Sequence, residues 1–323
     1  MPELPEVETI RRGLSECLVK EKGGKVLRVT VLSGKSFTGE PSKIMGTEVV
    51  EIRRKGKALI FDFANRMSVI CHLRMTGQLV WWDFSYSEEK SQRKESSKNF
   101  ESKSAVSDSK LDYDELLKHT FGGGHPTDGL LELPNSHTRV IIKFQKGTLF
   151  FNDQRKFGFM KVLPTNRVED DDFIRSLAKE PWQMKPDEFY RRIQRHKNAP
   201  IKMVILDQTV VAGLGNIYAD ESLYYAKIHP KRKAGEISEK EAKVLLEGAR
   251  KVMEKSLDAG GSTIRNYVKA DGTKGDYLDL FAEVYGREGE KCRRCGAEIV
   301  KMKLGGRGTH YCPECQKREC LVK

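Results

Sequence analysis

The spacing of apolar residues changes from helical to strand-like early in the chain. From residue 5 to residue 18, apolar side chains recur every three or four positions and Pro5 suits a first helical turn, so an amphipathic helix is predicted. Short runs rich in valine, isoleucine and aromatic residues follow, and they predict strands. These runs are 26–32, 48–54, 58–63, 68–73, 78–82, 139–144, 148–152 and 157–163. The first half therefore predicts a β-sandwich with one helix at its N-terminus.

A polar break interrupts the strands at residues 83–130. It is 48 residues long and contains nine serines. Loops longer than about 15 residues are usually functional or disordered, and this composition predicts disorder over residues 83–109. Residues 112–119 could form one short helix. We therefore expect a flexible insertion between two strands of the sandwich.

The second half has helical spacing. The predicted helices are 172–178, 187–197, 201–207, 217–227 and 239–258. Ser238 is a candidate N-cap of the last one, with Glu241 completing a capping box. Residues 164–166 form the predicted linker between the sandwich domain and the helical domain. The expected fold class is α+β, with a sandwich domain at 1–165, a helical domain at 166–285 and a small finger at 286–323.

Composition narrows the range of functions. The chain has 323 residues, is 38% apolar and lacks an uninterrupted apolar run of about 18 residues, which argues against wholesale disorder and against a membrane span. Its N-terminus is acidic and does not resemble a secretory signal, so we expect a cytoplasmic protein, associated with the nucleoid if the source is bacterial. Lysine and arginine outnumber aspartate and glutamate by 58 to 46, which favours a polyanionic partner, nucleic acid first.

Four of the seven cysteines form two Cys-x-x-Cys pairs separated by 16 residues. This spacing fits a closed zinc finger or ribbon in which four thiolates hold one structural ion. The four are Cys292, Cys295, Cys312 and Cys315. A redox pair is the alternative. Residues 286–323 contain ten lysines and arginines against five acidic residues, so we expect the finger to touch phosphate.

Two further segments carry candidate chemistry. Removal of Met1 would leave Pro2 with a secondary α-amine of pKa about 8, which can attack a sugar aldehyde carbon, with Glu3 and Glu6 as proton carriers. The acidic residues also fit the start of any helix. The Gly-rich turn at 213–216 precedes a predicted helix whose N-terminus could bind phosphate, although it also fits an ordinary helix–helix turn.

Other residues have two interpretations each. Lys57 belongs to a basic run that is also typical of a solvated strand edge. His72 lies in a predicted strand and fits a structural histidine better than a catalytic one. Residues 153–158 pair basic side chains with an aromatic one, which suits insertion into a nucleic-acid stack but also fits a common turn.

Taken together, these motifs resemble the formamidopyrimidine-DNA glycosylases, within the wider group that includes endonuclease VIII. The resemblance covers almost the whole chain except residues 83–130. The matching segments, besides the four-cysteine finger, are 2–9, 11–13, 53–57, 72–77, 153–158, 206–208, 213–221 and 229–230. The turn at 213–216 then corresponds to the family's helix–two-turn–helix element.

The resemblance implies a base-excision repair enzyme that is both a glycosylase and an abasic-site lyase. Pro2 matches the nucleophile that attacks C1′ of a flipped-out nucleotide, and Glu3 matches the acid that assists base departure. Lys57 matches the general acid/base of strand cleavage by β- and δ-elimination. Arg307 matches a finger arginine that contacts phosphate. This chemistry implies no catalytic metal and no diffusible cofactor.

A second set of positions matches residues that contact DNA. The gap left by the flipped base would be filled by Met75, Arg155 and Phe157. The DNA backbone would be bound by His137, Lys197 and Asn216. The implied partner is damaged double-stranded DNA bound by a monomer.

Residues 269–277 are similar to the purine-lesion loop of the formamidopyrimidine-DNA glycosylases, which favours 8-oxoguanine and formamidopyrimidines as substrates. An endonuclease VIII-like preference for oxidised pyrimidines is the nearest alternative. A non-catalytic zinc-finger DNA-binding protein and an RNA-binding zinc-ribbon protein are more distant ones. The chain departs from the family at residues 83–130 and in an extension, residues 316–323, that includes Cys320.

Overall fold

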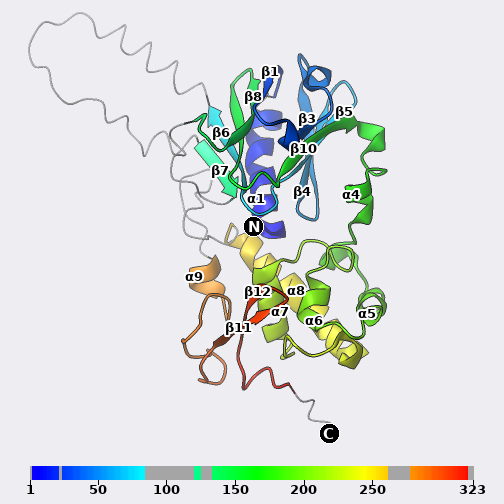
Figure 1. Cartoon of the computed structure of the whole chain (residues 1–323), viewed down its shortest axis with the longest axis vertical. Coiled ribbons are helices and arrows are strands. Elements are labelled where there is room, and N and C mark those ends of the chain that lie inside the picture. The colour runs from blue at the N-terminus through cyan, green and yellow to red at the C-terminus, as the bar shows by residue number, and fades with distance from the viewer. Residues whose placement is uncertain (1, 22–23, 84–119, 125–132, 261–276, 319–323) are drawn as a thin grey trace, which may run out of the picture.

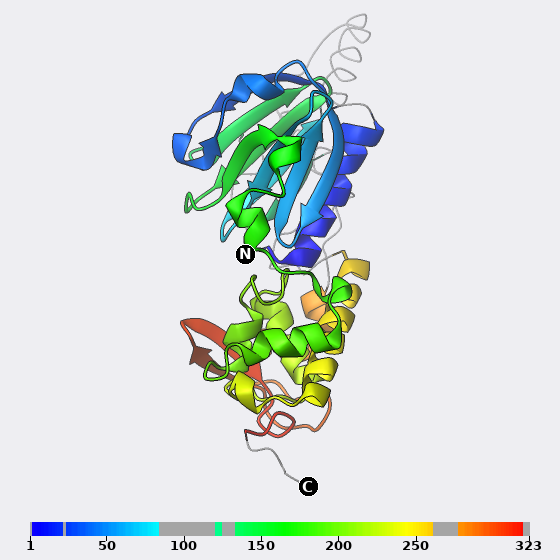
Figure 2. The same cartoon turned by 90° about the vertical axis from the view of Figure 1, so that its right-hand side faces the viewer.

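The computed structural model describes residues 2–21, 24–83, 120–124, 133–260 and 277–318 (Figure 1). The predicted disorder after Asp83, the predicted helix at 112–119, the lesion loop up to residue 276 and Cys320 lie outside the described residues. The molecule has two lobes along its long axis, a sheet lobe and a helical lobe (Figure 2). Among the described residues, none of the helices combines the length and hydropathy that a membrane span needs.

Two five-stranded sheets form the sandwich. Their strand orders are β1-β8-β9-β6-β7 and β2-β10-β5-β4-β3. The strands are β1 (Val26–Val31), β2 (Phe37–Thr38), β3 (Val49–Lys55), β4 (Ala58–Phe63), β5 (Met67–His72), β6 (Gly77–Asp83), β7 (Thr120–Gly124), β8 (Thr138–Phe144), β9 (Gly147–Asp153) and β10 (Phe159–Pro164). The eight strands expected from the sequence are confirmed, with ends shifted by at most two residues.

One strand lies inside the segment that was expected to be a flexible insertion. β7 pairs antiparallel with β6, from Gln78 opposite Gly124 to Trp82 opposite Thr120. The expectation of a continuous flexible insertion over residues 83–130 is therefore wrong for residues 120–124. Three consecutive glycines give no alternation of side chains, so only pairing with the edge of β6 defines this strand.

The N-terminal helix closes one open edge of the sandwich. α1 (Leu4–Ser15) continues into one turn of π-helix, Glu16–Lys20, and contacts β3 and β7, the last strands of the two sheets. The apolar residues at helical spacing are all at most 1% exposed and join the core between the sheets, as predicted. These residues are Val7, Ile10, Leu14 and Leu18. Burial of this face fixes where the chain's N-terminus lies.

A short helix stays with the sandwich after the predicted linker. α4 (Asp172–Ser176) begins at Asp171, whose carboxylate accepts hydrogen bonds from the amides of Phe173 and Ile174. Ile174 and Val168 pack against β4, β5 and β10 in a small buried cluster. The chain then crosses to the helical lobe.

The helical lobe is built around one long helix. Its elements are α5 (Pro186–Gln194), α6 (Ile201–Ile205), α7 (Asn216–Tyr225), α8 (Glu239–Asp258) and α9 (Tyr277–Phe281). Ser238 and Glu241 exchange the hydrogen bonds of the predicted capping box at the start of α8. α7 is buried on all sides because it packs against α8 on one face and against the finger hairpin on another. The hairpin consists of β11 (Val300–Leu304) and β12 (Arg307–Tyr311).

Candidate active site and DNA interface

The start of the chain meets the Gly-rich turn of the helical lobe. Pro2 is buried, and the amide of Leu4 donates to the carbonyl of Gly213 over 3.2 Å. The Glu3 carboxylate accepts from the backbone amides of Gly215 at 2.7 Å, Ile217 at 2.9 Å and Tyr218 at 3.4 Å. Glu3 thus occupies the N-terminus of α7, where the sequence had allowed a phosphate. A carboxylate there is stabilised by unpaired amides and the helix dipole.

Glycine is required at this contact. A Cβ on Gly215 would lie 2.2 Å from the Glu3 side-chain carboxyl carbon. Gly213 has φ of +100°, and a Cβ on it would lie 2.4 Å from Leu4 Cδ1. Close backbone approach and a left-handed conformation therefore explain the two glycines of this turn.

Lys57 joins this group from the turn between β3 and β4. Its ammonium donates to the carbonyl of Leu214 over 2.7 Å and the residue is 5% exposed. Burial lowers the pKa of Lys57 to about 8, opposed by the charges of Glu3 and Glu6. Burial raises the pKa of Glu3 to about 7, opposed by Lys57 and by backbone hydrogen bonds. Glu3, which follows Pro2 directly, and Lys57 thus interact with each other and have pKa values near neutrality, the range that suits proton transfer.

Glu6 links the peptide after Pro2 to the helical lobe. One of its oxygens accepts the amide of Glu3 over 2.8 Å, and the other accepts the Tyr218 hydroxyl over 2.7 Å. The Ser256 hydroxyl lies 2.5 Å from the Tyr218 hydroxyl. Glu6 was expected at the site from the sequence, whereas Tyr218 and Ser256 were not, because aromatic and serine residues inside helices carry no signal of such a contact.

A salt bridge clamps the turn that carries Lys57. Arg54 donates two hydrogen bonds to the Glu180 carboxylate, at 2.5 and 3.0 Å, and a third to Glu8 on α1 at 3.1 Å. The amide of Gly56 donates to the same Glu180 over 2.8 Å. Glu180 follows α4 in the chain, so this clamp holds the β3–β4 turn next to the helical lobe.

Arg307 approaches the site from the finger. It is exposed at the first position of β12, and its charge contributes to lowering the pKa of Lys57. The carbonyl of the next residue, Gly308, accepts from Lys202 Nζ at 3.0 Å and from Asn216 Nδ2 at 2.9 Å. Asn216, expected to bind the DNA backbone, thus contacts the finger in this structure.

A buried ion pair fixes the finger hairpin to the helical lobe. Lys202 and Asp220 are both fully buried, with 2.8 Å between Nζ and Oδ1. Lys202 also donates to the Thr309 hydroxyl over 2.8 Å, and Asp220 accepts the His310 amide over 2.9 Å. This pair was not expected from the sequence. Its one signal is a lysine inside the apolar segment 201–205.

The predicted gap-filling residues lie on two turns of the sandwich. Met75 and Phe157 are 38% and 56% exposed, which is unusual for large apolar side chains. The Arg155 guanidinium carbon lies 5.1 Å from the centre of the Phe157 ring. His137 is half-buried on a third turn of this lobe, and Lys197 is exposed on the helical lobe after α5.

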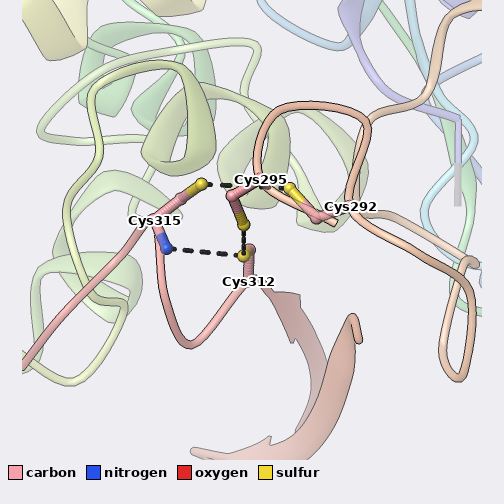
Figure 3. Close-up of side chains that lie close together, drawn as sticks. All are labelled: Cys292, Cys295, Cys312 and Cys315. Atoms are coloured by element: carbon pink, nitrogen blue, oxygen red, sulfur yellow. Dashed lines mark hydrogen bonds between the residues drawn. The ribbon is translucent and has the colours of Figure 1, made fainter. Parts of the chain in front are cut away.

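The four finger cysteines converge as predicted (Figure 3). Their sulfur atoms all lie within 4.8 Å of one another. The Cys292 and Cys315 sulfurs are 3.9 Å apart, and those of Cys295 and Cys312 are 3.5 Å apart. Four thiol ligands are the donor set of a structural zinc site, so the finger binds one structural zinc ion. Cys17 and Cys71 lie elsewhere, in the sheet lobe.

Comparison with known proteins agrees with this geometry. The model of the formamidopyrimidine-DNA glycosylase N-terminal domain matches residues 1–160, and the model of that enzyme's H2TH domain matches residues 177–268. A zinc finger found in FPG and IleRS matches residues 289–318. The chain belongs to the formamidopyrimidine-DNA glycosylase family. Members combine DNA glycosylase and abasic-site lyase activity, so the chain is a base-excision repair enzyme that acts on damaged DNA.

Relatives match along their whole length. The formamidopyrimidine-DNA glycosylase of Exiguobacterium is 36% identical, covering 98% of this chain and 100% of the relative. That of Listeria innocua is 35% identical with the same coverage. The Lactococcus lactis enzyme has been solved with DNA containing N7-benzyl-Fapy-dG and with DNA containing an abasic site. Both structures cover 98% of this chain and 100% of the solved chain at 32% identity, with a TM-score of 0.75.

Proposed function

We propose that this glycosylase removes oxidised purines, namely 8-oxoguanine and formamidopyrimidines, and then cleaves the abasic strand. The observation that carries the proposal is the meeting of Pro2, Glu3 and Lys57 at the junction of the two lobes, with Arg307 reaching it from the finger. The lesion assignment rests on the similarity of residues 269–277 to the purine-lesion loop. All of these groups come from one chain, which fits a monomer.

The proposed reaction starts at Pro2 after removal of Met1. Its neutral secondary amine attacks C1′, the bond from C1′ to the base breaks, and the departing base takes up the proton that the amine loses. Ring opening, assisted by the protonated carboxyl of Glu3, gives an iminium between Pro2 and the sugar. The iminium acidifies C2′, and successive β- and δ-elimination expel the 3′ and then the 5′ phosphate.

Lys57 and Arg307 have separate roles in the proposal. Lys57 carries protons during the elimination steps, for which a pKa of about 8 is suitable. Arg307 binds a phosphate beside the lesion and stabilises the charge on the leaving phosphate. The gap left by the flipped nucleotide is filled by Met75, Arg155 and Phe157. Phosphates flanking it are bound by His137, Lys197 and Asn216.

Borohydride trapping tests the nucleophile. Protein with a verified Pro2 N-terminus should form a covalent adduct with abasic DNA and with duplexes containing 8-oxoguanine opposite cytosine. The matched control keeps one extra residue ahead of Pro2, which turns the amine into an amide and should abolish trapping. Absence of an adduct with the verified protein would contradict the proposal.

The lesion class needs its own comparison. An oxidised-purine enzyme should cleave 8-oxoguanine opposite cytosine faster than thymine glycol opposite adenine in single-turnover assays. The reverse order would assign the chain to oxidised pyrimidines, the alternative left open by the sequence. Intact DNA binding by the verified protein, without trapping or strand cleavage on any of these duplexes, would favour a non-catalytic DNA-binding role.

A further inference from the structure

Three turns that carry predicted DNA contacts converge on one buried residue, Asp153. Asp153 is the last residue of β9 and is 0% exposed. Its carboxylate accepts hydrogen bonds from the Thr76 hydroxyl at 2.5 Å, the Arg155 amide at 3.2 Å and the Gly158 amide at 2.7 Å. One side chain therefore links the turn after β5, which carries Met75, to the turn after β9, which carries Phe157.

The backbone of Asp153 reaches the third turn. Its amide donates to the carbonyl of His137 over 2.8 Å, and its carbonyl accepts from Arg139 Nε over 2.8 Å. Arg139 in turn donates to the carbonyl of Ser136 over 3.0 Å. The segment containing His137 is thus held against the same residue.

Thr76 closes the link between the two gap-filling turns. Its hydroxyl donates to Asp153 and accepts the Arg155 amide over 3.0 Å. Gly158 leaves no space for adjustment, because a Cβ there would lie 2.8 Å from Phe151 Cζ and 3.2 Å from an Asp153 carboxylate oxygen. The donors fixed by Asp153 belong to the turns, whereas Met75 and Phe157 project from those turns with large exposed fractions.

We infer that Asp153, with Thr76, is a positioning residue that sets the spacing of the gap-filling side chains. This inference rests on the proposed function. A buried carboxylate with three donors is a rigid reference point, since moving it would leave buried donors without a hydrogen-bond partner. Met75 and Phe157 have to enter the base stack together with Arg155 as the lesion leaves it. Their separation must then be fixed before DNA binds.

Thr76→Val and Asp153→Asn test this inference. The first removes one hydroxyl at nearly constant volume, and the second places an amide N–H₂ against backbone donors. The readouts are the single-turnover rate of 8-oxoguanine excision and the rate of borohydride trapping on abasic DNA. Abasic DNA has no base to extrude, so positioning matters less there. We expect the ratio of excision to trapping to fall about tenfold or more, since small misplacements cost up to about 10²-fold.

Controls separate positioning from folding. Thr76→Ser keeps the hydroxyl and should restore the ratio. Ser68→Ala removes another hydroxyl–carboxylate bond, to Asp62, at the opposite end of β5, and should leave the ratio unchanged. If Asp153→Asn does not fold, the comparison of Thr76→Val with Thr76→Ser tests the inference.

The outcomes distinguish this inference from the proposed function. Wild-type protein that traps DNA, with an unchanged ratio in Thr76→Val, would overturn the positioning role. A proportional loss of both rates together with thermal stability would make Asp153 a residue of the fold alone and would also overturn it. Absence of trapping by wild-type protein would instead reject the nucleophile.

Discussion

Glu3 of the sheet lobe caps the helix that begins after Gly215 of the helical lobe. The distance from the Gly215 amide to the carboxylate is 2.7 Å, and the two residues are 212 positions apart in the chain. The bond ties the residue next to Pro2 to α7. Several consequences of this contact can be measured.

Base excision should depend on the protonation of Glu3. The Pro2 amine, with an ordinary pKa of about 8, should give the excision rate an ascending limb, and deprotonation of Glu3, whose pKa burial holds near 7, should give it a descending limb at higher pH. Single-turnover rates between pH 5.5 and pH 9 would show the descending limb, whose apparent pKa belongs to Glu3 and Lys57 together. Glu3→Gln should remove the descending limb, while Glu51→Gln, at an exposed carboxylate on β3, should keep it. An identical profile in Glu3→Gln would reject Glu3 as the acid.

The raised pKa of Glu3 also predicts how the stability of the folded protein depends on pH. Protonation of Glu3 stabilises the folded protein, because its folded-state pKa of about 7 lies above the ordinary value of 4.5. This contribution is fully present below pH 4.5 and is lost as the pH rises through about 7. Denaturant unfolding across this range should show a smaller pH dependence in Glu3→Gln than in the wild type. An unchanged dependence would mean that other groups account for it.

Gly215→Ala should damage both stability and activity. The added Cβ would meet the Glu3 carboxyl group at 2.2 Å, so the two lobes must shift at the contact beside Pro2. Overpacking of this kind costs about 1–3 kcal/mol, and displacement of Glu3 should slow excision further. Gly34→Ala is the matched control, since a Cβ there meets nothing within 4 Å. Wild-type excision by Gly215→Ala would show that the contact has no catalytic importance.

The Lys202–Asp220 pair should show strong coupling. Lys202→Met leaves the Asp220 carboxylate buried without its cation, which should cost about 3–5 kcal/mol in the free energy of unfolding. Adding Asp220→Asn removes the charge and keeps an acceptor for the His310 amide, so the double variant should recover part of the loss. Denaturant unfolding of the four proteins completes a double-mutant cycle. Additive effects would show that the pair does not act as a unit.

Zinc removal should unfold the finger while the sandwich stays folded. A chelator should release one zinc ion per chain and abolish strand cleavage, because β12 carries Arg307 and the small finger has little apolar core. Metal analysis, circular dichroism and cleavage assays would follow the three effects. Cys295→Ser should mimic the chelator, whereas Cys17→Ser should retain zinc. Full cleavage by metal-depleted protein would contradict a structural role for the ion.

Local patterns predicted the elements of the fold well. The spacing of Val7, Ile10 and Leu14 fixes both the helix and its buried face, and the capping box at Ser238 gives the start of α8. β7 was missed because its three glycines have no alternation to detect. Local sequence therefore fails where an element exists only through pairing with a neighbour.

Residues of the candidate site could be predicted only where the residue type and its position in the sequence already indicate a reaction or a ligand. The cysteine spacing identified the zinc site, and the character of an N-terminal proline drew attention to Pro2. The partners of these groups come from remote segments. Arg54 and Glu180 are 126 positions apart, and no local sequence pattern predicts their contact. The use of Glu3 as a helix cap was missed for the same reason.

Because Glu3 contacts α7, the proposed reactive centre is built from both lobes. The sheet lobe holds the amine and the lysine, and the helical lobe holds the amides that fix the carboxylate between them. On the proposed mechanism, neither lobe alone contains all the groups that the reaction needs. Cleavage activity should therefore depend on contact between the lobes. Any treatment that separates the lobes should abolish cleavage before it unfolds either lobe.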